Sequence, residues 1–185
     1  MKNTRKIGAL ICIVLVAILT LTGCSLNIGG KNSNKKEAIN KKDLEGYTEY
    51  VHSSGVRFSY PSEWKNLGTS SKPVFGDTST GTSVNYLSES VPKTYNLTSY
   101  MSAAVANVKK TMEVVGDIEE NEVTLNGKDA SIIKYTVKQS DTNVVIKQAC
   151  FLDSENAHIL TTATLESNYE KEAEAMDNVI SSFMK

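Results

Sequence analysis

The sequence predicts an α+β domain over residues 46–185, in which an antiparallel β-sheet is flanked by helices. Four apolar segments between residues 122 and 165 are separated by short polar turns, as in an antiparallel meander. Two further segments, 97–115 and 167–183, carry apolar residues at steps of three and four, which indicates helices with one buried face. Packing such helices on a sheet buries the apolar surface of both.

The first 23 residues are predicted to be a leader that precedes this domain. Lys2, Arg5 and Lys6 form a basic start, and residues 7–21 form an apolar stretch. A membrane-spanning helix needs roughly 20 apolar residues. The shorter stretch therefore favours a cleaved signal peptide, with an uncleaved membrane anchor as the alternative.

Leu21-Thr22-Gly23-Cys24 ends the leader and resembles the cleavage site of a bacterial lipoprotein signal, which has a leucine, two small residues and a cysteine. The resemblance implies cleavage between Gly23 and Cys24, a diacylglyceryl group on the Cys24 thiol and an acyl chain such as palmitate. A thiol suits this transfer because its thiolate is a good nucleophile. Two or three acyl chains hold a protein stably on a membrane. We therefore expect a lipid anchor at Cys24, on the extracytoplasmic face of the cell membrane.

Residues 24–45 contain this cysteine and a predicted flexible tether. The segment is rich in Asn, Lys, Gly and Ser and has no hydrophobic periodicity. A flexible chain of this length reaches roughly 25 Å. Its Lys- and Asn-rich composition favours a Gram-positive envelope.

The domain is predicted to begin with two strands. Residues 56–60 alternate between apolar and polar side chains, and Pro61 ends this strand because proline has no amide donor for a ladder. A turn then places Trp64 against the sheet. Residues 65–83 are interpreted as a loop, and residues 83–89 as a second strand.

The first helix is expected over 97–115, with Asn96 as its N-cap and Gly116 as its stop. Its apolar stripe is interpreted as core; it comprises Leu97, Tyr100, Met101, Ala104, Val105, Val108, Met112 and Val115.

Four strands, 122–125, 128–138, 143–153 and 157–165, are expected to follow. Asn126-Gly127 joins the first two and is the strongest hairpin signal in the chain, because both residues tolerate positive φ. The closing helix is expected to start with a capping box of Ser167 and Glu170. Its buried stripe comprises Tyr169, Ala173, Met176, Val179, Ile180 and Phe183.

The charge balance argues against a nucleic-acid partner. The whole chain has 20 basic and 21 acidic residues, and residues 46–185 have 12 basic and 18 acidic ones. Nucleic-acid affinity depends on Lys and Arg that neutralise phosphates, so an acidic domain is a poor candidate.

No catalytic, cofactor or metal site is predicted. Cys12 leaves with the leader, and Cys150 lies in an apolar strand pattern where it is expected to be a small buried hydrophobe. His52 and His158 are far apart in sequence, whereas metal ligands usually cluster. The acidic run 117–122 lacks the regular oxygen spacing of a calcium loop. Nucleophile-elbow and phosphate-loop motifs are absent from the sequence.

The segment 55–64, GVRFSYPSEW, is similar to the opening of PsbP-like domains. Tyr169 and the end of the last helix, Ile180-Ser181-Ser182-Phe183, resemble the closing helix of that family. The resemblance covers roughly residues 46–185 and implies an α/β/α sandwich that serves as a non-enzymatic binding scaffold. It brings no shared functional residue, so Tyr60-Pro61 and Trp64 are interpreted as structural.

The preferred hypothesis is a lipid-anchored extracytoplasmic binding or accessory protein that contacts an envelope protein through residues 65–83. One alternative is an envelope hydrolase with an unrecognised site, which would need clustered carboxylates or a Ser–His pair. Another is a small-ligand carrier lipoprotein.

Overall fold

The computed structural model describes residues 36–185, so the predicted leader, Cys24 and most of the predicted tether lie outside the described residues. The elements, in chain order, are β1 (Glu37–Ile39), β2 (Tyr47–Val51), β3 (Arg57–Pro61), β4 (Lys65–Asn66), β5 (Val74–Asp77), β6 (Thr82–Ser90), α1 (Leu97–Thr111), β7 (Val114–Leu125), β8 (Lys128–Gln139), β9 (Thr142–Leu152), β10 (Asn156–Leu165), the 3-10 turn Glu166–Asn168 and α2 (Tyr169–Ser181).

A large mixed sheet organises the domain, with the strand order β1-β7-β8-β9-β10-β6-β5-β4. The predicted antiparallel meander is confirmed in β7 to β10. After β10 the sheet continues through β6, which comes from the first half of the domain and pairs antiparallel with it. This long-range pairing brings the two ends of the domain together. Strands β2 and β3 form a separate two-stranded ribbon.

Strand β1 corrects the extent of the predicted tether, which was expected to reach residue 45. Residues 37–39 pair in parallel with residues 123–125 at the end of β7. The ammonium group of Lys36 lies 3.5 Å from Glu122 and 3.2 Å from Asp129, which secures the start of β1. Three residues are too few to show a hydrophobic period, so the pairing is specified by the neighbouring strand and not by the local sequence.

The predicted Asn126-Gly127 hairpin is confirmed between β7 and β8. Asn126 and Gly127 have φ values of 49° and 81°, as a tight hairpin turn requires. The Asn126 side chain also donates 2.9 Å hydrogen bonds to the backbone oxygens of Ser181 and Phe183. The turn therefore fixes the position where α2 ends.

Helix α1 begins as predicted but ends earlier than predicted. The Asn96 side chain accepts a hydrogen bond from the Ser99 amide, and Ser99 returns the contact in a capping box. The helix stops at Thr111, and Val114 and Val115 instead pair with β8. β-Branched residues suit a strand better than a helix, so the ladder determines their conformation. Gly116, the expected helix stop, has a φ of 75° and lies at an irregularity in β7.

The predicted capping box of α2 is wrong. Ser167 lies inside the 3-10 turn, Asn168 is the N-cap residue, and no side chain caps the helix start. Three residues of the predicted buried stripe, Met176, Val179 and Ile180, are nevertheless buried in α2.

The segment 65–83 is also not the loop that was expected. Strands β4 and β5 lie within it and extend the sheet beyond β6. A Cβ atom on Gly76 would come within 2.5 Å of the Thr82 carbonyl oxygen, so glycine allows the close approach of β5 to β6. The ribbon strand β2 was not predicted either.

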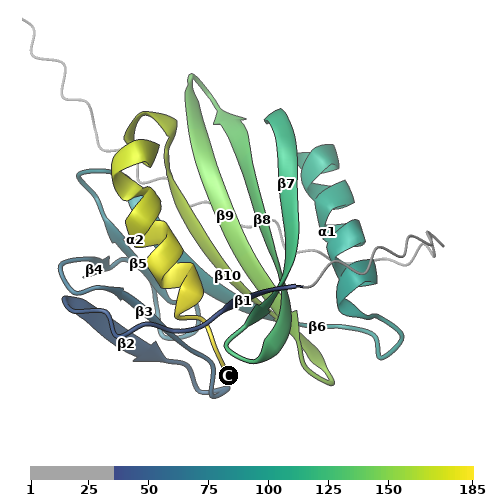
Figure 1. Cartoon of the computed structure of the whole chain (residues 1–185). Helices are drawn as coiled ribbons and strands as arrows, with labels where there is room; N and C mark the ends of the chain where they lie inside the picture. The colour runs from purple at the N-terminus through teal and green to yellow at the C-terminus, as the bar shows by residue number, and fades with distance from the viewer. Residues whose placement is uncertain (1–35) are drawn as a thin grey trace, which may run out of the picture.

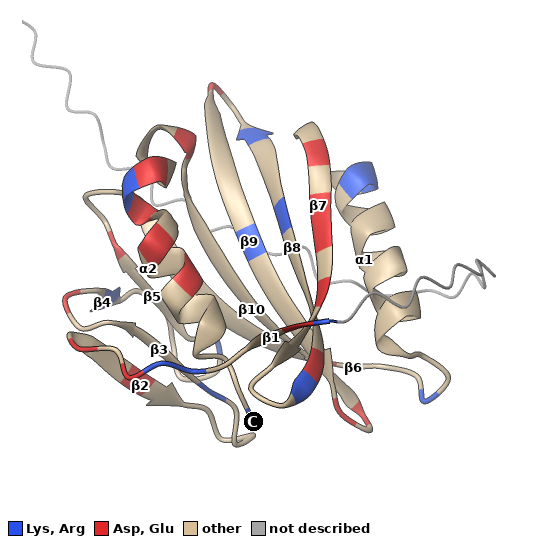
Figure 2. Cartoon of the chain, in the orientation of Figure 1, with Lys and Arg blue, Asp and Glu red and all other residues tan. Residues whose placement is uncertain are grey.

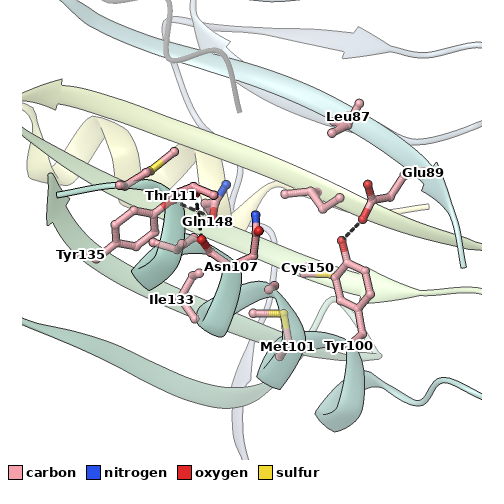
Figure 3. Close-up of a pocket in the computed structure, with 14 residues that line it drawn as sticks. Leu87, Glu89, Tyr100, Met101, Asn107, Thr111, Ile133, Tyr135, Gln148 and Cys150 are labelled. Carbon is pink, nitrogen blue, oxygen red and sulfur yellow. Dashed lines mark hydrogen bonds between the residues drawn. The ribbon is translucent and has the colours of Figure 1, made fainter. Parts of the chain in front are cut away.

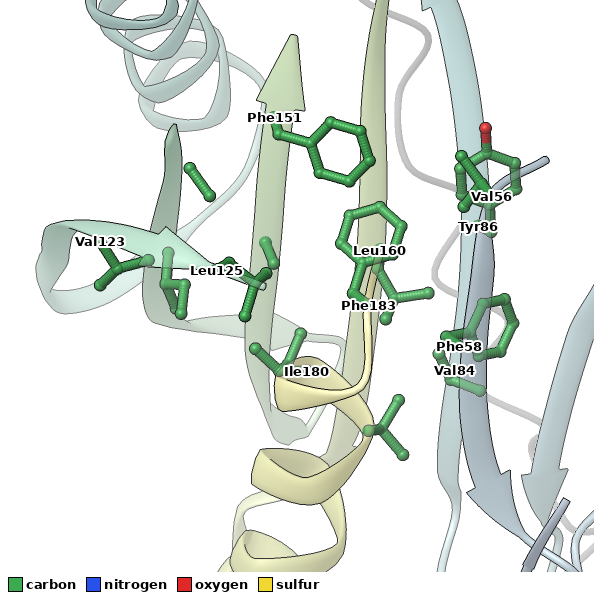
Figure 4. Close-up of a cluster of buried hydrophobic side chains, with 14 of the residues drawn as sticks. Val56, Phe58, Val84, Tyr86, Val123, Leu125, Phe151, Leu160, Ile180 and Phe183 are labelled. Carbon is green, nitrogen blue, oxygen red and sulfur yellow. The ribbon is translucent and has the colours of Figure 1, made fainter. Parts of the chain in front are cut away.

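The two faces of the sheet carry separate apolar cores. Figure 1 shows α2 next to the β2–β3 ribbon, with α1 on the other side of the large sheet. Residues on α2, β3 and one face of β8 to β10 form the first core, in which Phe151, Leu160 and Phe183 converge (Figure 4). Residues on α1 and the opposite face of the same strands form the second core. Trp64 is buried in the first core, as predicted.

Acidic side chains gather along α2 and β7 (Figure 2). On β7, Glu119 lies 3.2 Å from Lys134 of the neighbouring strand. Because β1 covers only the end of β7, much of this strand is an exposed edge. Charged side chains on such an edge hinder pairing with another chain, which gives the acidic run a structural role.

Candidate functional site

A small apolar cavity lies between α1 and the sheet. Its volume is about 40 Å³. Apolar side chains from the helix and from three strands make up most of its wall: Leu87, Met101, Ala104, Val108, Ile133 and Ile159. Figure 3 shows this site with the helix lying along the strands. Apolar walls with a few polar groups are typical of small-molecule sites, which at roughly 300–1,000 Å³ are larger than this cavity.

Glu89 and Tyr100 form the polar end of this cavity. The Tyr100 hydroxyl donates a 2.5 Å hydrogen bond to Oε1 of Glu89, as Figure 3 shows. Burial raises the pKa of Glu89, while the hydrogen bond from Tyr100 acts in the opposite direction. Burial also raises the pKa of Tyr100. Tyr100 is buried and Glu89 is half-buried, so this carboxyl group is the acceptor nearest to a donor that enters the cavity.

A second polar group, made of three buried side chains, lies deeper in the wall. The Tyr135 hydroxyl donates to Oε1 of Gln148 at 3.1 Å, and the Gln148 amide donates to the Thr161 hydroxyl at 2.9 Å. Each side chain thereby satisfies its neighbour, so this group stiffens the wall and offers little to a ligand.

Cys150 lines the same cavity and is buried, as predicted. Burial raises the pKa of its thiol, with a further increase from the negative charge of Glu89. A thiol of raised pKa holds little thiolate at neutral pH and is unreactive. Cys150 therefore contributes shape to the cavity and no nucleophile.

The two histidines belong to one chain of hydrogen bonds on the other face of the sheet. His52 Nδ1 lies 2.9 Å from the Ser54 hydroxyl, which lies 3.3 Å from the Tyr86 hydroxyl. The Tyr86 hydroxyl lies 2.8 Å from His158 Nδ1, and His158 Nε2 lies 2.8 Å from Asp153. His52 lies in the connection between β2 and β3, and His158 lies on β10, within a strand that the sequence predicted.

Partner chemistry fixes the His158 tautomer. A carboxylate only accepts, so Nε2 donates to Asp153 and Nδ1 accepts from the Tyr86 hydroxyl. Burial lowers the pKa of His158, and this effect outweighs the opposing one of Asp153. Hydrogen bonds from His158 and from Lys185 lower the pKa of Asp153. The histidine is thus neutral, and Lys185 supplies the positive charge that Asp153 faces at 2.6 Å.

The two contacts that a catalytic histidine needs, one to a serine and one to a carboxylate, are made here by two different histidines. Ser54 contacts His52, but no carboxylate contacts His52 in the described residues. Asp153 orients His158, but His158 contacts a tyrosine in place of a serine. In a Ser–His–Asp triad one histidine has both contacts. The geometry fits a structural network that joins the C-terminus, β6 and β10.

His158 gives the folded state a specific pH dependence. Its pKa is lower in the folded state than the ordinary value of about 6.5, so the unfolded chain binds more protons as the pH falls. The stability that His158 contributes is therefore present above pH 6.5 and lost as the pH falls from there towards the folded pKa. Glu89, whose pKa is raised, acts in the opposite direction.

We predict that His158→Gln lowers the free energy of unfolding by about 1–3 kcal/mol at pH 7, through two altered buried hydrogen bonds. The difference from the unaltered chain should shrink between pH 7 and pH 5, as measured by urea unfolding. Glu89, Asp153, Lys185 and Lys128 are present in both proteins, so the comparison isolates His158. A difference that widens on acidification would mean that the folded state holds His158 protonated.

Cys24, the one site residue predicted from the sequence, lies outside the described residues. The predicted partner loop is reduced to a short exposed tip, 69–72, between β4 and β5. Thr69 and Lys72 close this tip with reciprocal backbone hydrogen bonds of 3.0 and 3.2 Å. None of the helices in residues 36–185 is long and apolar enough to cross a membrane.

Comparison with known proteins identifies relatives of the chain. Residues 7–184 match the family profile described as PsbP-like protein. No curated protein matches the sequence. The fold is similar to that of three solved proteins at low sequence identity.

The first of these is the cyanobacterial PsbP protein CyanoP of Synechocystis sp. PCC 6803, with a TM-score of 0.54, 16% identity and coverage of 76% of this chain and 93% of CyanoP. The second is PA94, a putative regulator of unknown function from Pseudomonas aeruginosa. Its TM-score is 0.55 at 12% identity, and the match covers 75% of this chain and 96% of PA94. The third is LpqN of Mycobacterium tuberculosis, which is involved in cell envelope biogenesis. Its TM-score is 0.55 at 14% identity, and the match covers 75% of this chain and 89% of LpqN. At these identities the structural likeness establishes the fold alone.

Proposed function

We propose, because this chain belongs to the PsbP-like protein family, that it is a binding or accessory protein held by lipid on the extracytoplasmic face of the cell membrane. It acts there by contacting an envelope protein, and it catalyses no reaction. The observation that carries the proposal is the leader ending in Leu21-Thr22-Gly23-Cys24, placed before a single domain of this family. A Gram-positive envelope suits the Lys- and Asn-rich segment that follows.

The distance from anchor to domain supports action close to the bilayer. Twelve residues, 25–36, separate Cys24 from β1. Fully extended, they span at most about 40 Å. Docking of β1 on β7 shortens the connection that the sequence predicted, so the domain stays within about one domain diameter of the lipid. A partner should therefore be a membrane protein or a protein held at the membrane.

The fold gives the proposal a precedent in another envelope. LpqN, which shares this fold, is involved in cell envelope biogenesis. Its 14% identity carries no partner over to this chain.

The non-catalytic part of the proposal is supported by two incomplete groups of hydrolase residues. Ser54 contacts His52, whereas Asp153 contacts His158. Covalent labelling of Ser54 by a fluorophosphonate, which reacts with activated serines, would contradict that part.

The exposed tip 69–72 is the place to test for a partner. We expect a photo-crosslinking residue at Ser70 to capture one specific envelope protein in intact cells. The same residue at Lys171, exposed on α2, is the matched control and should not capture it. The product should disappear when residues 1–24 are replaced by a cleaved secretory signal that leaves no lipidated cysteine, because binding then loses its high effective concentration at the membrane.

Three results would contradict the proposal. One is a set of captured proteins that is the same at Ser70 and Lys171. Another is a specific product that persists unchanged without the anchor. The third is the absence of any envelope protein among the products at either position.

A further inference from the structure

The cavity beneath α1 has one carboxyl group, Glu89, with an oxygen that accepts no hydrogen bond from the described residues. Oε1 of Glu89 accepts a hydrogen bond from Tyr100, but Oε2 takes none from the described residues. No lysine or arginine in residues 36–185 forms an ion pair with Glu89. The side chain is nevertheless half-buried. Every buried side-chain nitrogen and oxygen of the described residues has a hydrogen-bond partner, so the free Oε2 of Glu89 is reached by solvent and is available to a ligand.

The remainder of the cavity is apolar and adaptable. Met101 and Met112 line it, and methionine side chains adjust to the shape of what they contact. Two side-chain hydrogen bonds tie α1 to the sheet, from Tyr100 to Glu89 at 2.5 Å and from Thr98 to Glu122 at 3.4 Å. An outward shift of the helix would enlarge the cavity without breaking any pairing between strands.

We propose that this cavity binds a small apolar molecule that carries one protonated amine. The apolar part lies among Met101, Ile133 and Ile159, and the ammonium group donates to the free oxygen of Glu89. Three facts select this class: the wall is apolar, the single charged group in it is a carboxylate, and Tyr100 already holds that carboxylate in place. An anion would be repelled by Glu89, and an alcohol would gain only a neutral donor.

This inference goes beyond the proposed function, because it needs neither the lipid anchor nor a protein partner. It can therefore fail while that proposal stands, and the reverse also holds. It differs as well from the hydrogen-bonded chain of His52 and His158, which lies on the opposite face of the sheet.

Three probes of equal chain length test the inference: n-butylamine, n-butanol and butyrate. Each is titrated into the full chain at pH 7 while NMR follows the methyl resonances of Met101 and Met112. We expect n-butylamine to shift these resonances with a Kd about tenfold lower than that of n-butanol, as a charge-assisted hydrogen bond provides. Butyrate should bind more weakly than either.

Glu89→Gln is the decisive variant, because it keeps the size of the side chain and removes the charge. We expect it to raise the Kd of n-butylamine to that of n-butanol and to leave n-butanol unchanged. Glu174→Gln removes a charge from the exposed face of α2 and is the matched control, with no expected effect. If Glu89→Gln disturbs the fold, the three probes on the unaltered chain decide alone.

Equal affinity for n-butylamine and n-butanol would overturn the inference. So would tighter binding of butyrate, amine binding that survives Glu89→Gln, or the absence of any shift at Met101 with all three probes.

Discussion

Replacing Cys24 with serine is expected to abolish the incorporation of labelled palmitate into the chain. Lipid transfer needs a thiol, because its thiolate is a far better nucleophile than a hydroxyl group. The variant then lacks the acyl chains, in which each buried CH2 group contributes about 0.8 kcal/mol to membrane binding. Cleavage before residue 24 should also fail, so the variant should migrate as the longer precursor. Metabolic labelling and immunoblotting of cell fractions measure both effects.

Cys12→Ser is the matched control for this experiment, since it makes the same chemical change inside the leader. It should keep both the label and the mature size, because we expect Cys12 to be removed with residues 1–23. Cys150 is a less suitable control because it is buried in the core. Labelling that persists at the same level in Cys24→Ser would show that the lipid is attached elsewhere or that the label is not covalent.

Phe183→Ala should have the largest effect on stability. Phe183 follows the end of α2, is 0% exposed, and lies in the first core with its ring centroid 4.8 Å from that of Phe151 and 6.2 Å from that of Tyr86. Figure 4 shows the ring beside Phe151 and Leu160, beyond the end of α2. Truncation of a buried phenylalanine leaves a cavity and typically costs about 3–5 kcal/mol. Urea unfolding should show a correspondingly lower midpoint.

Val51→Ala is the control for this measurement. Val51 is 54% exposed on the β2–β3 ribbon, and substitutions at such positions change stability by about 0.5 kcal/mol or less. A loss of less than about 1 kcal/mol in Phe183→Ala would mean that the C-terminal segment does not close the first core. The two aromatic contacts would then make little contribution to holding α2 on the sheet.

The parts of the fold that local chemistry specifies were predictable from the sequence. The Asn126-Gly127 turn needs positive φ at two successive positions, and Asn96 caps a helix by its own side chain. Both signals are contained within a few residues. The burial of Cys150 follows in the same way from its apolar neighbours in the chain, and that of Trp64 from the turn after Pro61.

The missed elements depend on distant partners. β1 has three residues and is defined by β7, and β5 is defined by the close approach of Gly76 to β6. The end of α1 was misplaced because Val114 and Val115 fit the apolar period of the helix, whereas pairing with β8 decides their conformation. Val115 is consequently 40% exposed, and not part of the core.

The candidate cavity was not predicted, although one signal for it exists in the sequence. Glu89 shares a strand face with Leu87, so a carboxylate follows an apolar residue on the side of β6 opposite to Val84 and Tyr86. A charged residue in that position indicates a polar site within a core. That Tyr100 contacts this carboxylate depends on how α1 packs, which no local pattern specifies.

The central claim is that the working form of the protein is a domain attached to the membrane through a lipidated Cys24. Intact-mass spectrometry of the natural protein, extracted from cells with detergent, tests this most directly. The account predicts a chain that begins at residue 24 and carries the mass of a diacylglyceryl group, with or without a third acyl chain. A chain that begins at Met1, or one that begins at residue 24 without acyl mass, would contradict it.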